Sequence, residues 1–159
     1  MSLILAIDPG YDRVGIAIIE KDGKNRETLL YSDCFCTDKT QTITERIFSA
    51  GQEVEWLIKQ FAPEMMALEK LFFANNKTTA MGVSEARGAL LYIASQYNLK
   101  IVEYTPVEIK VAVASYGKAT KEDVHNMVAK LITLPTKKRL DDEVDAIALG
   151  LTALAHKGF

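Results

Sequence analysis

The 159-residue sequence contains only two cysteines, two histidines and one tryptophan. It has no cysteine or histidine spacing typical of structural zinc, so we expect neither a zinc-stabilised nor a disulfide-stapled fold. Cys34 and Cys36 are two residues apart, and neighbours at this spacing on a strand do not easily bridge each other. We therefore expect two buried, reduced thiols, as in a cytosolic protein.

The sequence also lacks a long apolar run, a low-complexity stretch and an internal repeat. The apolar residues near the N-terminus form a run too short to cross a membrane, and no basic leader or cleavage site accompanies them. We therefore expect a cytoplasmic protein without a membrane partner. The length fits one domain over residues 1–159, with a core large enough to need no covalent staple.

The net charge is −2, which does not by itself favour a nucleic-acid partner. Between Pro106 and Leu140, however, seven Lys or Arg residues oppose three Asp or Glu residues, a local charge of +4 that leaves −6 for the remainder. Such a segment is compatible with phosphate binding, although a solvated helical face explains it equally well.

Hydrophobic periodicity predicts strands first and helices later. Short turns join the first three strands, which favours an antiparallel meander, and the later strands alternate with helices, which favours parallel pairing. The expected strands are 3–8, 14–20, 28–37, 65–68 and 100–104, and the expected helices are 43–61, 79–98, 106–115, 121–131 and 142–156. The sequence therefore predicts an α/β fold with a mixed five-stranded sheet, its first three strands antiparallel, flanked by helices.

Carboxylates stand where these patterns predict apolar side chains. Asp8 and Glu69 each end a strand that is otherwise apolar, and Asp145 lies within a helix that is apolar around most of its circumference. A carboxylate in such surroundings costs on the order of several kcal/mol unless a proton, a basic partner or a metal ion compensates it. Strand ends at one edge of an α/β sheet often form sites, and oxygen ligands suit Mg²⁺ or Mn²⁺. The acids therefore predict a site in which two such ions promote phosphoryl transfer.

Spacing alone leaves a fourth acid open. Asp142 lies three residues before Asp145 and Asp141 lies four residues before it, so either one shares a helix face with Asp145. We expect Asp141 and Glu143 to cap the N-terminus of this helix, where negative charge is favourable. For Asp8, the alternative explanation is an Asx-type turn before the following Pro-Gly pair.

Several longer segments occur in an order and spacing typical of one known family. They are Ile7-Asp8-Pro9-Gly10 with Gly15, Ala67-Leu68-Glu69-Lys70-Leu71-Phe72, Glu85-Ala86-Arg87-Gly88, Glu103-Tyr104-Thr105-Pro106, and residues 107–110, 116–121 and 142–148. Over nearly its whole length the chain resembles the RuvC family of Holliday junction resolvases, which implies the ribonuclease H-like fold.

The resemblance implies that Asp8, Glu69, Asp142 and Asp145 are the catalytic, metal-binding acids, and so it selects Asp142 over Asp141. It implies Mg²⁺ as the cofactor, with Mn²⁺ as a substitute and two ions per site. It also implies a homodimer that cuts four-way junction DNA by paired symmetrical nicks. Such enzymes work with the branch-migration complex RuvA and RuvB in bacterial recombinational repair.

The resemblance extends to residues that would contact DNA. Lys110 and Lys121 match family positions near the scissile phosphate, where they would neutralise its charge, and Lys118 is a further candidate. Phe72 matches an aromatic residue expected to stack on an unpaired base, whereas we expect Phe73 to pack in the protein.

The helix expected over 79–98 begins with a segment rich in small residues, 80–88. In the family this helix lies at the dimer interface, although packing against the sheet would explain the composition equally well. Two alternatives to a nuclease also remain. One is an actin-like ATPase, whose phosphate loop resembles the first segment but which needs a second lobe. The other is a junction-binding module without catalytic activity.

Overall fold

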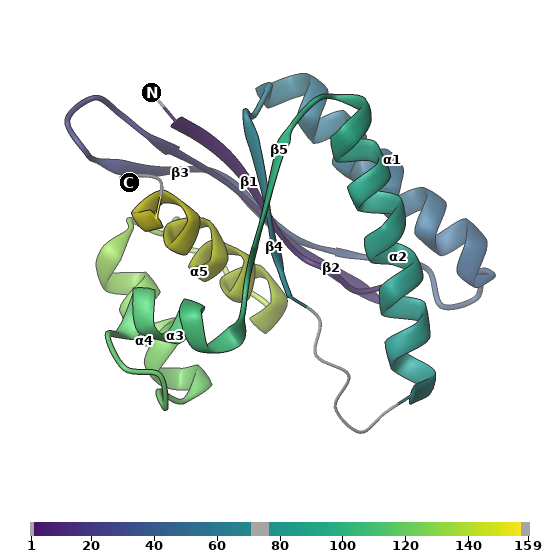
Figure 1. Ribbon diagram of the computed structural model, residues 1–159. Helices are drawn as coiled ribbons and strands as arrows, with labels where there is room; N and C mark the ends of the chain where they lie inside the picture. The colour runs from purple at the N-terminus through teal and green to yellow at the C-terminus, as the bar shows by residue number, and fades with distance from the viewer. Residues whose placement is uncertain (1, 71–76, 157–159) are drawn as a thin grey trace.

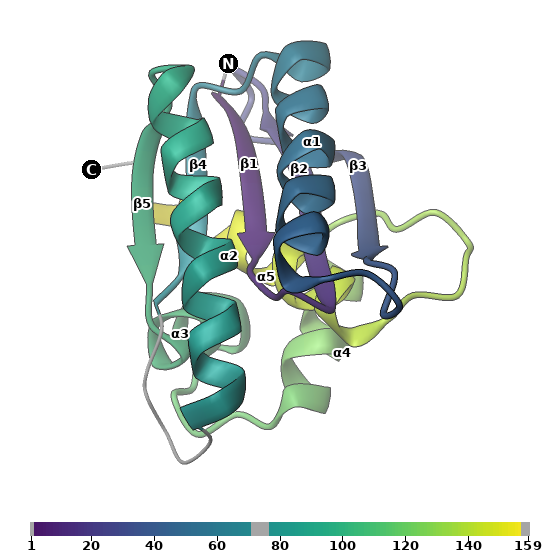
Figure 2. The ribbon, with the colours of Figure 1, turned by 90° about the vertical axis from the view of Figure 1, so that its right-hand side faces the viewer.

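The computed structural model describes residues 2–70 and 77–156, which form one five-stranded sheet with helices on both faces (Figures 1 and 2). The strands are β1 (Ser2–Asp8), β2 (Arg13–Lys21), β3 (Glu27–Cys36), β4 (Met65–Glu69) and β5 (Lys100–Tyr104). The helices are α1 (Ile43–Phe61), α2 (Lys77–Gln96), α3 (Pro106–Ala114), α4 (Lys121–Leu131) and α5 (Asp141–His156). Every expected element is present, with ends that differ by at most two residues. No helix in the described part of the chain is long and apolar enough to span a membrane.

The strand order in the sheet is β3-β2-β1-β4-β5. The first three strands pair antiparallel, and β4 pairs parallel with both β1 and β5, so the predicted mixed sheet is confirmed. Because β1, β4 and β5 run in the same direction, their carboxyl ends meet at one edge of the sheet, the lower edge in Figure 2.

Two hydrophobic cores lie on opposite faces of the sheet, one under α1 and α2 and the other under α3, α4 and α5 (Figure 1). Alternate residues of β1 serve the two cores: Leu5 and Ile7 belong to the first, and Ile4 and Ala6 to the second. All four side chains are fully buried. The central strand is therefore apolar on both faces up to its last residue, Asp8.

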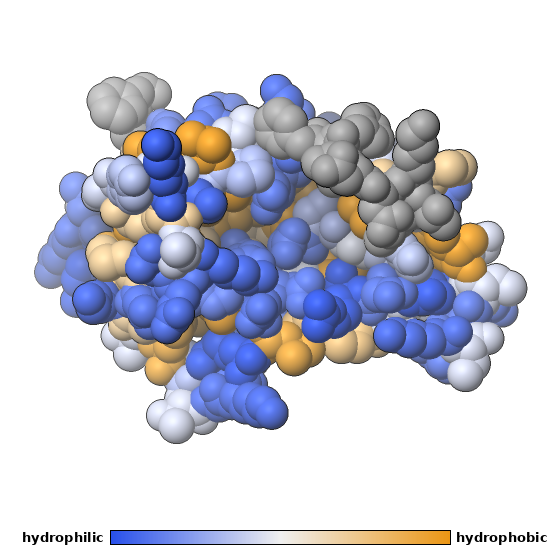
Figure 3. Space-filling view, turned by 90° about the horizontal axis from the view of Figure 1, so that it is seen from below, coloured by the Kyte–Doolittle hydropathy of each residue, from blue (hydrophilic) through white to orange (hydrophobic). Residues whose placement is uncertain are grey.

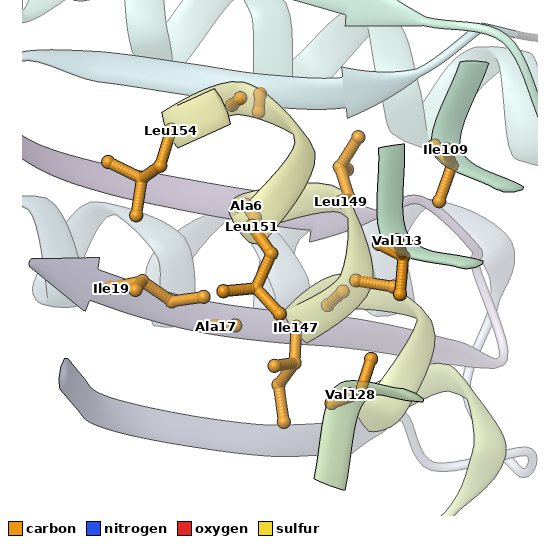
Figure 4. Close-up of a cluster of buried hydrophobic side chains, with 14 of the residues drawn as sticks. Ala6, Ala17, Ile19, Ile109, Val113, Val128, Ile147, Leu149, Leu151 and Leu154 are labelled. Carbon is orange, nitrogen blue, oxygen red and sulfur yellow. The ribbon is translucent and has the colours of Figure 1, made fainter. Parts of the chain in front are cut away.

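Helix α5 packs very closely on β1 and β2. Figure 4 shows Ile147 and Leu151 of this helix beside Ala17 and Ile19 of β2. A Cβ atom at Gly150 would lie only 2.8 Å from Cδ1 of Ile19, so the contact depends on the absence of a side chain there. This packing fixes the position of the helix that carries Asp142 and Asp145, two of the four acids of the predicted site.

The expectation of two buried thiols is wrong. Both cysteines are free, but Cys34 is only partly buried and Cys36 is exposed. They lie on β3, which is an edge strand of the sheet, so one side of their strand faces solvent.

Candidate active site

Asp8 and Glu69 are the last residues of the neighbouring parallel strands β1 and β4. Burial raises the pKa of Asp8 to about 7, and the negative charges of Glu69, Asp145 and Asp142 add to the shift. The pKa of Glu69 is also raised, first by burial and then by the charge of Asp145. The four acids that the sequence singled out are therefore close enough to oppose one another's ionisation at this end of the sheet.

Gly15 of β2 brings the start of α5 against the end of β1. It pairs with Asp8, and a Cβ atom at this glycine would lie 1.9 Å from the backbone oxygen of Asp142. Of the two acids that spacing left open, Asp142 is the one whose charge raises the pKa of Asp8, and its side chain is 22% exposed. The side chain of Asp141 is 69% exposed and points its carboxylate toward Lys121.

Both carboxylate oxygens of Asp145 have partners on α4. Lys121 Nζ lies 2.8 Å from Oδ2, and His125 Nε2 lies 2.8 Å from Oδ1. Partial burial lowers the pKa of Lys121, but the hydrogen bond and charge of Asp145, together with Asp141, outweigh it and raise the pKa overall. Lys121 and His125 are one helical turn apart, so a single face of α4 holds Asp145.

Arg13 makes the corresponding contact with Asp142 from the start of β2, with its Nε 3.2 Å from Oδ2. The sequence reasoning missed both Arg13 and His125. For His125 a signal existed, because it lies four residues after the candidate Lys121 and so shares its helix face. Arg13 carried a weaker signal, as a charged residue directly before the apolar run 14–19 of β2.

A cavity of about 190 Å³ lies beside the acids, and Glu69, Asp145, Lys110 and Lys121 supply its polar lining. Lys110 and Lys121 reach it because α3 and α4 begin nearby, each with a threonine capping box, Thr105 with Glu108 and Thr120 with Asp123. Figure 3 shows that hydrophilic side chains cover much of this end of the molecule.

Lys118, a further predicted DNA contact, is not among the residues that line this cavity. Lys118 is exposed in the loop between α3 and α4 and forms no ion pair with the described residues. Phe72 and Phe73 lie outside the described residues.

The expectation that Glu143 caps α5 is wrong. Its side chain is almost fully buried, accepts a hydrogen bond from Ser32 Oγ at 2.6 Å and forms ion pairs with Lys137 Nζ at 2.9 Å and Arg139 Nε at 3.1 Å. Two cations and a hydroxyl compensate the buried charge, which sequence spacing could not reveal because Ser32 is distant in the chain.

Within residues 2–70 and 77–156, no three His, Cys, Asp or Glu side chains are arranged to hold a metal ion as they stand. Protein cations pair with Asp142 and Asp145 of α5. Burial, and then the charges of the three other acids, nevertheless keep the pKa of Asp8 raised, so these cations compensate the negative charge of the group only in part. Four carboxylates without a neutral ligand among them are a hard-oxygen donor set, so the residues fit divalent ions such as Mg²⁺ or Mn²⁺.

Comparison with known proteins gives consistent matches along the whole chain. The sequence profile of the family described as Crossover junction endodeoxyribonuclease RuvC matches residues 4–155. RuvC of Moorella thermoacetica is 41% identical over 157 residues, which cover 99% of this chain and 92% of that protein. RuvC of Thermotoga maritima is 39% identical over 146 residues, covering 92% and 86% of the two chains.

Solved structures agree with the sequence matches. RuvC of Thermus thermophilus in complex with a Holliday junction substrate aligns with a TM-score of 0.91 and 29% identity, covering 99% of this chain and 95% of that one. The yeast mitochondrial Holliday junction resolvase aligns with a TM-score of 0.74 over 99% and 79% of the chains. Its identity of 12% shows likeness in fold alone.

The buried charge of Asp8 predicts a pH-dependent stability in the metal-free protein. The folded state holds a proton on Asp8 up to about pH 7, whereas the unfolded chain releases it near 3.8, so folding becomes less favourable as pH rises between these values. The substitution Asp8→Asn removes this loss of folding stability, because asparagine does not release a proton in this pH range. In urea unfolding with EDTA, we expect the stability of the variant relative to wild type to increase by on the order of 2 kcal/mol from pH 5 to pH 8.

Glu122→Gln is the control, because Glu122 is exposed on α4. The difference in free energy of unfolding between Glu122→Gln and wild type should be the same at pH 5 and at pH 8. If the difference in free energy of unfolding between Asp8→Asn and wild type also stays the same at both pH values, the buried, like-charged surroundings of Asp8 are contradicted.

Proposed function

The chain belongs to the RuvC family of crossover junction endodeoxyribonucleases, enzymes that hydrolyse phosphodiester bonds in DNA, and we propose that it resolves Holliday junctions. In this proposal it cuts a four-way junction by paired symmetrical nicks, which DNA ligase can seal, during bacterial recombinational repair. The observation that supports it most directly is the group of four acids at the ends of β1, β4 and the start of α5, with cationic side chains beside them.

We assign the metal site to Asp8, Glu69, Asp142 and Asp145, with Mg²⁺ as the ion, Mn²⁺ as a substitute and two ions per site. When bound, these ions supply the activation of a water molecule and the stabilisation of the leaving oxygen. The acids fix the place of the ions because all four stand on packed elements: Asp8 and Glu69 end buried strands, and the other two lie on α5, which is held against Gly15. Rigid placement of this kind lowers the reorganisation needed for reaction.

The lysines of the cavity have a separate role in the proposal. Lys121 and Lys110 lie on the same cavity as Glu69 and Asp145, so a phosphate entering it meets two positive charges. These charges offset the negative charge that builds on the phosphate during attack. Lys118 and Phe72 would contact DNA farther from the reacting atoms, the first through a phosphate and the second by stacking on a base.

We further propose a homodimer that uses the outer face of α1 and α2. Phe48, Met81 and Tyr92 on these helices are each more than half exposed. Phe48 and Tyr92 line a hollow of about 390 Å³ between the helices, together with Ile47 and Ile93. A large exposed apolar patch is typical of an interaction site, and symmetrical cutting requires two active sites.

The remaining assignments rest on family membership. We propose that residues 1–159 form a single RuvC-like domain and that the protein acts in the bacterial cytoplasm. We also propose that it works on junctions together with the branch-migration complex RuvA and RuvB.

The test of the function is incubation with a synthetic mobile four-way junction and Mg²⁺. We expect paired symmetrical nicks from wild type, whereas Glu69→Gln should bind the junction and lose at least about a hundredfold in cutting rate, since a metal ligand is removed. Linear duplex and ATP are parallel substrates. Equal cutting of linear duplex would contradict junction selectivity, and ATP hydrolysis without nicking would favour the actin-like alternative.

The dimer is tested by Tyr92→Glu, which places a charge in the exposed apolar face. We expect sedimentation velocity to show a dimer for wild type and a shift toward monomer for the variant, because burying an unpaired charge opposes association. Leu30→Glu is the matched control, since Leu30 is an exposed apolar residue on β3. If Tyr92→Glu leaves the dimer unchanged and Leu30→Glu abolishes it, the interface does not lie on the outer face of α1 and α2.

A further inference from the structure

A second group of cations lies on the β3 side of the acids. Lys110 approaches the acids from α3, which directly follows the edge strand β5, and Lys121 approaches them from the start of α4. The segment that joins α4 to α5, residues 132–140, lies on the other side. It contains Lys137, Lys138 and Arg139 and no acidic residue, and Figure 2 shows it as a wide loop beside β3.

Contacts with β3 and α5 hold this loop in place. Lys137 Nζ donates to the backbone oxygen of Ser32 at 2.8 Å and pairs with Glu143 at 2.9 Å. Arg139 Nε lies 3.1 Å from the same carboxylate, and its Nη1 donates to the Lys137 oxygen at 3.3 Å. The loop is therefore ordered before any ligand binds, which lowers the entropy lost on binding.

The charge of the loop is only partly compensated. Glu143 offsets one of the two cations that it contacts, and Arg139, whose side chain is 10% exposed, keeps Nη2 without a hydrogen-bond partner in the described chain. Lys138, between the two anchored residues, is exposed and forms no ion pair or side-chain hydrogen bond with the described residues. Arg13 is half exposed and extends this positive side toward the acids.

We propose that Lys138, supported by the anchored Lys137 and Arg139 and by Arg13, binds the sugar–phosphate backbone of the cleaved DNA strand. The inference rests on the proposed function and adds a second contact to it, on the side of the acids opposite Lys110. A strand that passes the acids extends in both directions, and cations on both sides fix its position without reading its sequence. Glu143 joins the loop to α5, the helix that carries Asp142 and Asp145. In the proposal, α5 and its attached loop therefore position both the DNA strand and two of the acids.

Lys138→Ala tests the proposal, because this side chain is exposed and its removal breaks no ion pair or side-chain hydrogen bond within the described residues. We measure junction binding in EDTA over a range of salt concentrations. At low salt the variant should bind about three- to tenfold more weakly than wild type, and the slope of log K against log salt should be smaller by about 1. Lys138→Arg keeps the charge and should restore both values.

Lys24→Ala is the matched control, an exposed lysine in the turn between β2 and β3, at the opposite end of the strands from Asp8. It should leave affinity and slope unchanged. If wild type binds and cuts the junction while Lys138→Ala matches Lys24→Ala, the inference fails and the proposed function stands. A wild-type protein that neither binds nor cuts the junction would overturn the proposed function and the inference with it.

Discussion

The carboxylate of Asp8 ends a strand whose side chains are apolar on both faces, and burial among three other acids raises its pKa to about 7. Much of this end of the molecule serves to accommodate that negative charge. Lys121 and His125 bond Asp145, Arg13 bonds Asp142, and Gly15 allows the start of α5 to approach Asp8. The approach at Gly15 adds the charge of Asp142 to the surroundings of Asp8, and the cations offset the repulsion only in part, since burial and the three other acids keep the pKa of Asp8 raised.

This incomplete compensation connects the fold to the proposed chemistry. An isolated buried carboxylate without a counter-charge is unfavourable, so a site that retains one is suited to a cation supplied from outside. In the proposal, divalent ions take over the role that Arg13 and Lys121 play in the metal-free protein. The two side chains then become available to the phosphate, and the positive loop 137–139 continues the same surface on the β3 side.

Local sequence patterns were sufficient to predict the strands and the helices. They also identified the acids at the strand ends, because a charged residue at the end of an apolar strand is visible in the sequence. Spacing could not separate Asp141 from Asp142, since both share a face with Asp145, and the packing of α5 against Gly15 decides which one approaches Asp8. Glu143 was misassigned, and Arg13 was missed, because their partners come from distant parts of the chain. Contacts between distant segments are set by tertiary packing, which periodicity does not describe.

The most direct measurement is a crystal structure of the protein soaked in Mn²⁺, with the ions located by anomalous scattering. The account predicts two Mn²⁺ ions, each with carboxylate oxygens of the four acids at about 2.1 Å. It also predicts that Lys121 and Arg13 have moved away from Asp145 and Asp142. Saturating Mn²⁺ with no ion at Asp8 and Glu69, and with both cation–aspartate pairs intact, would contradict it.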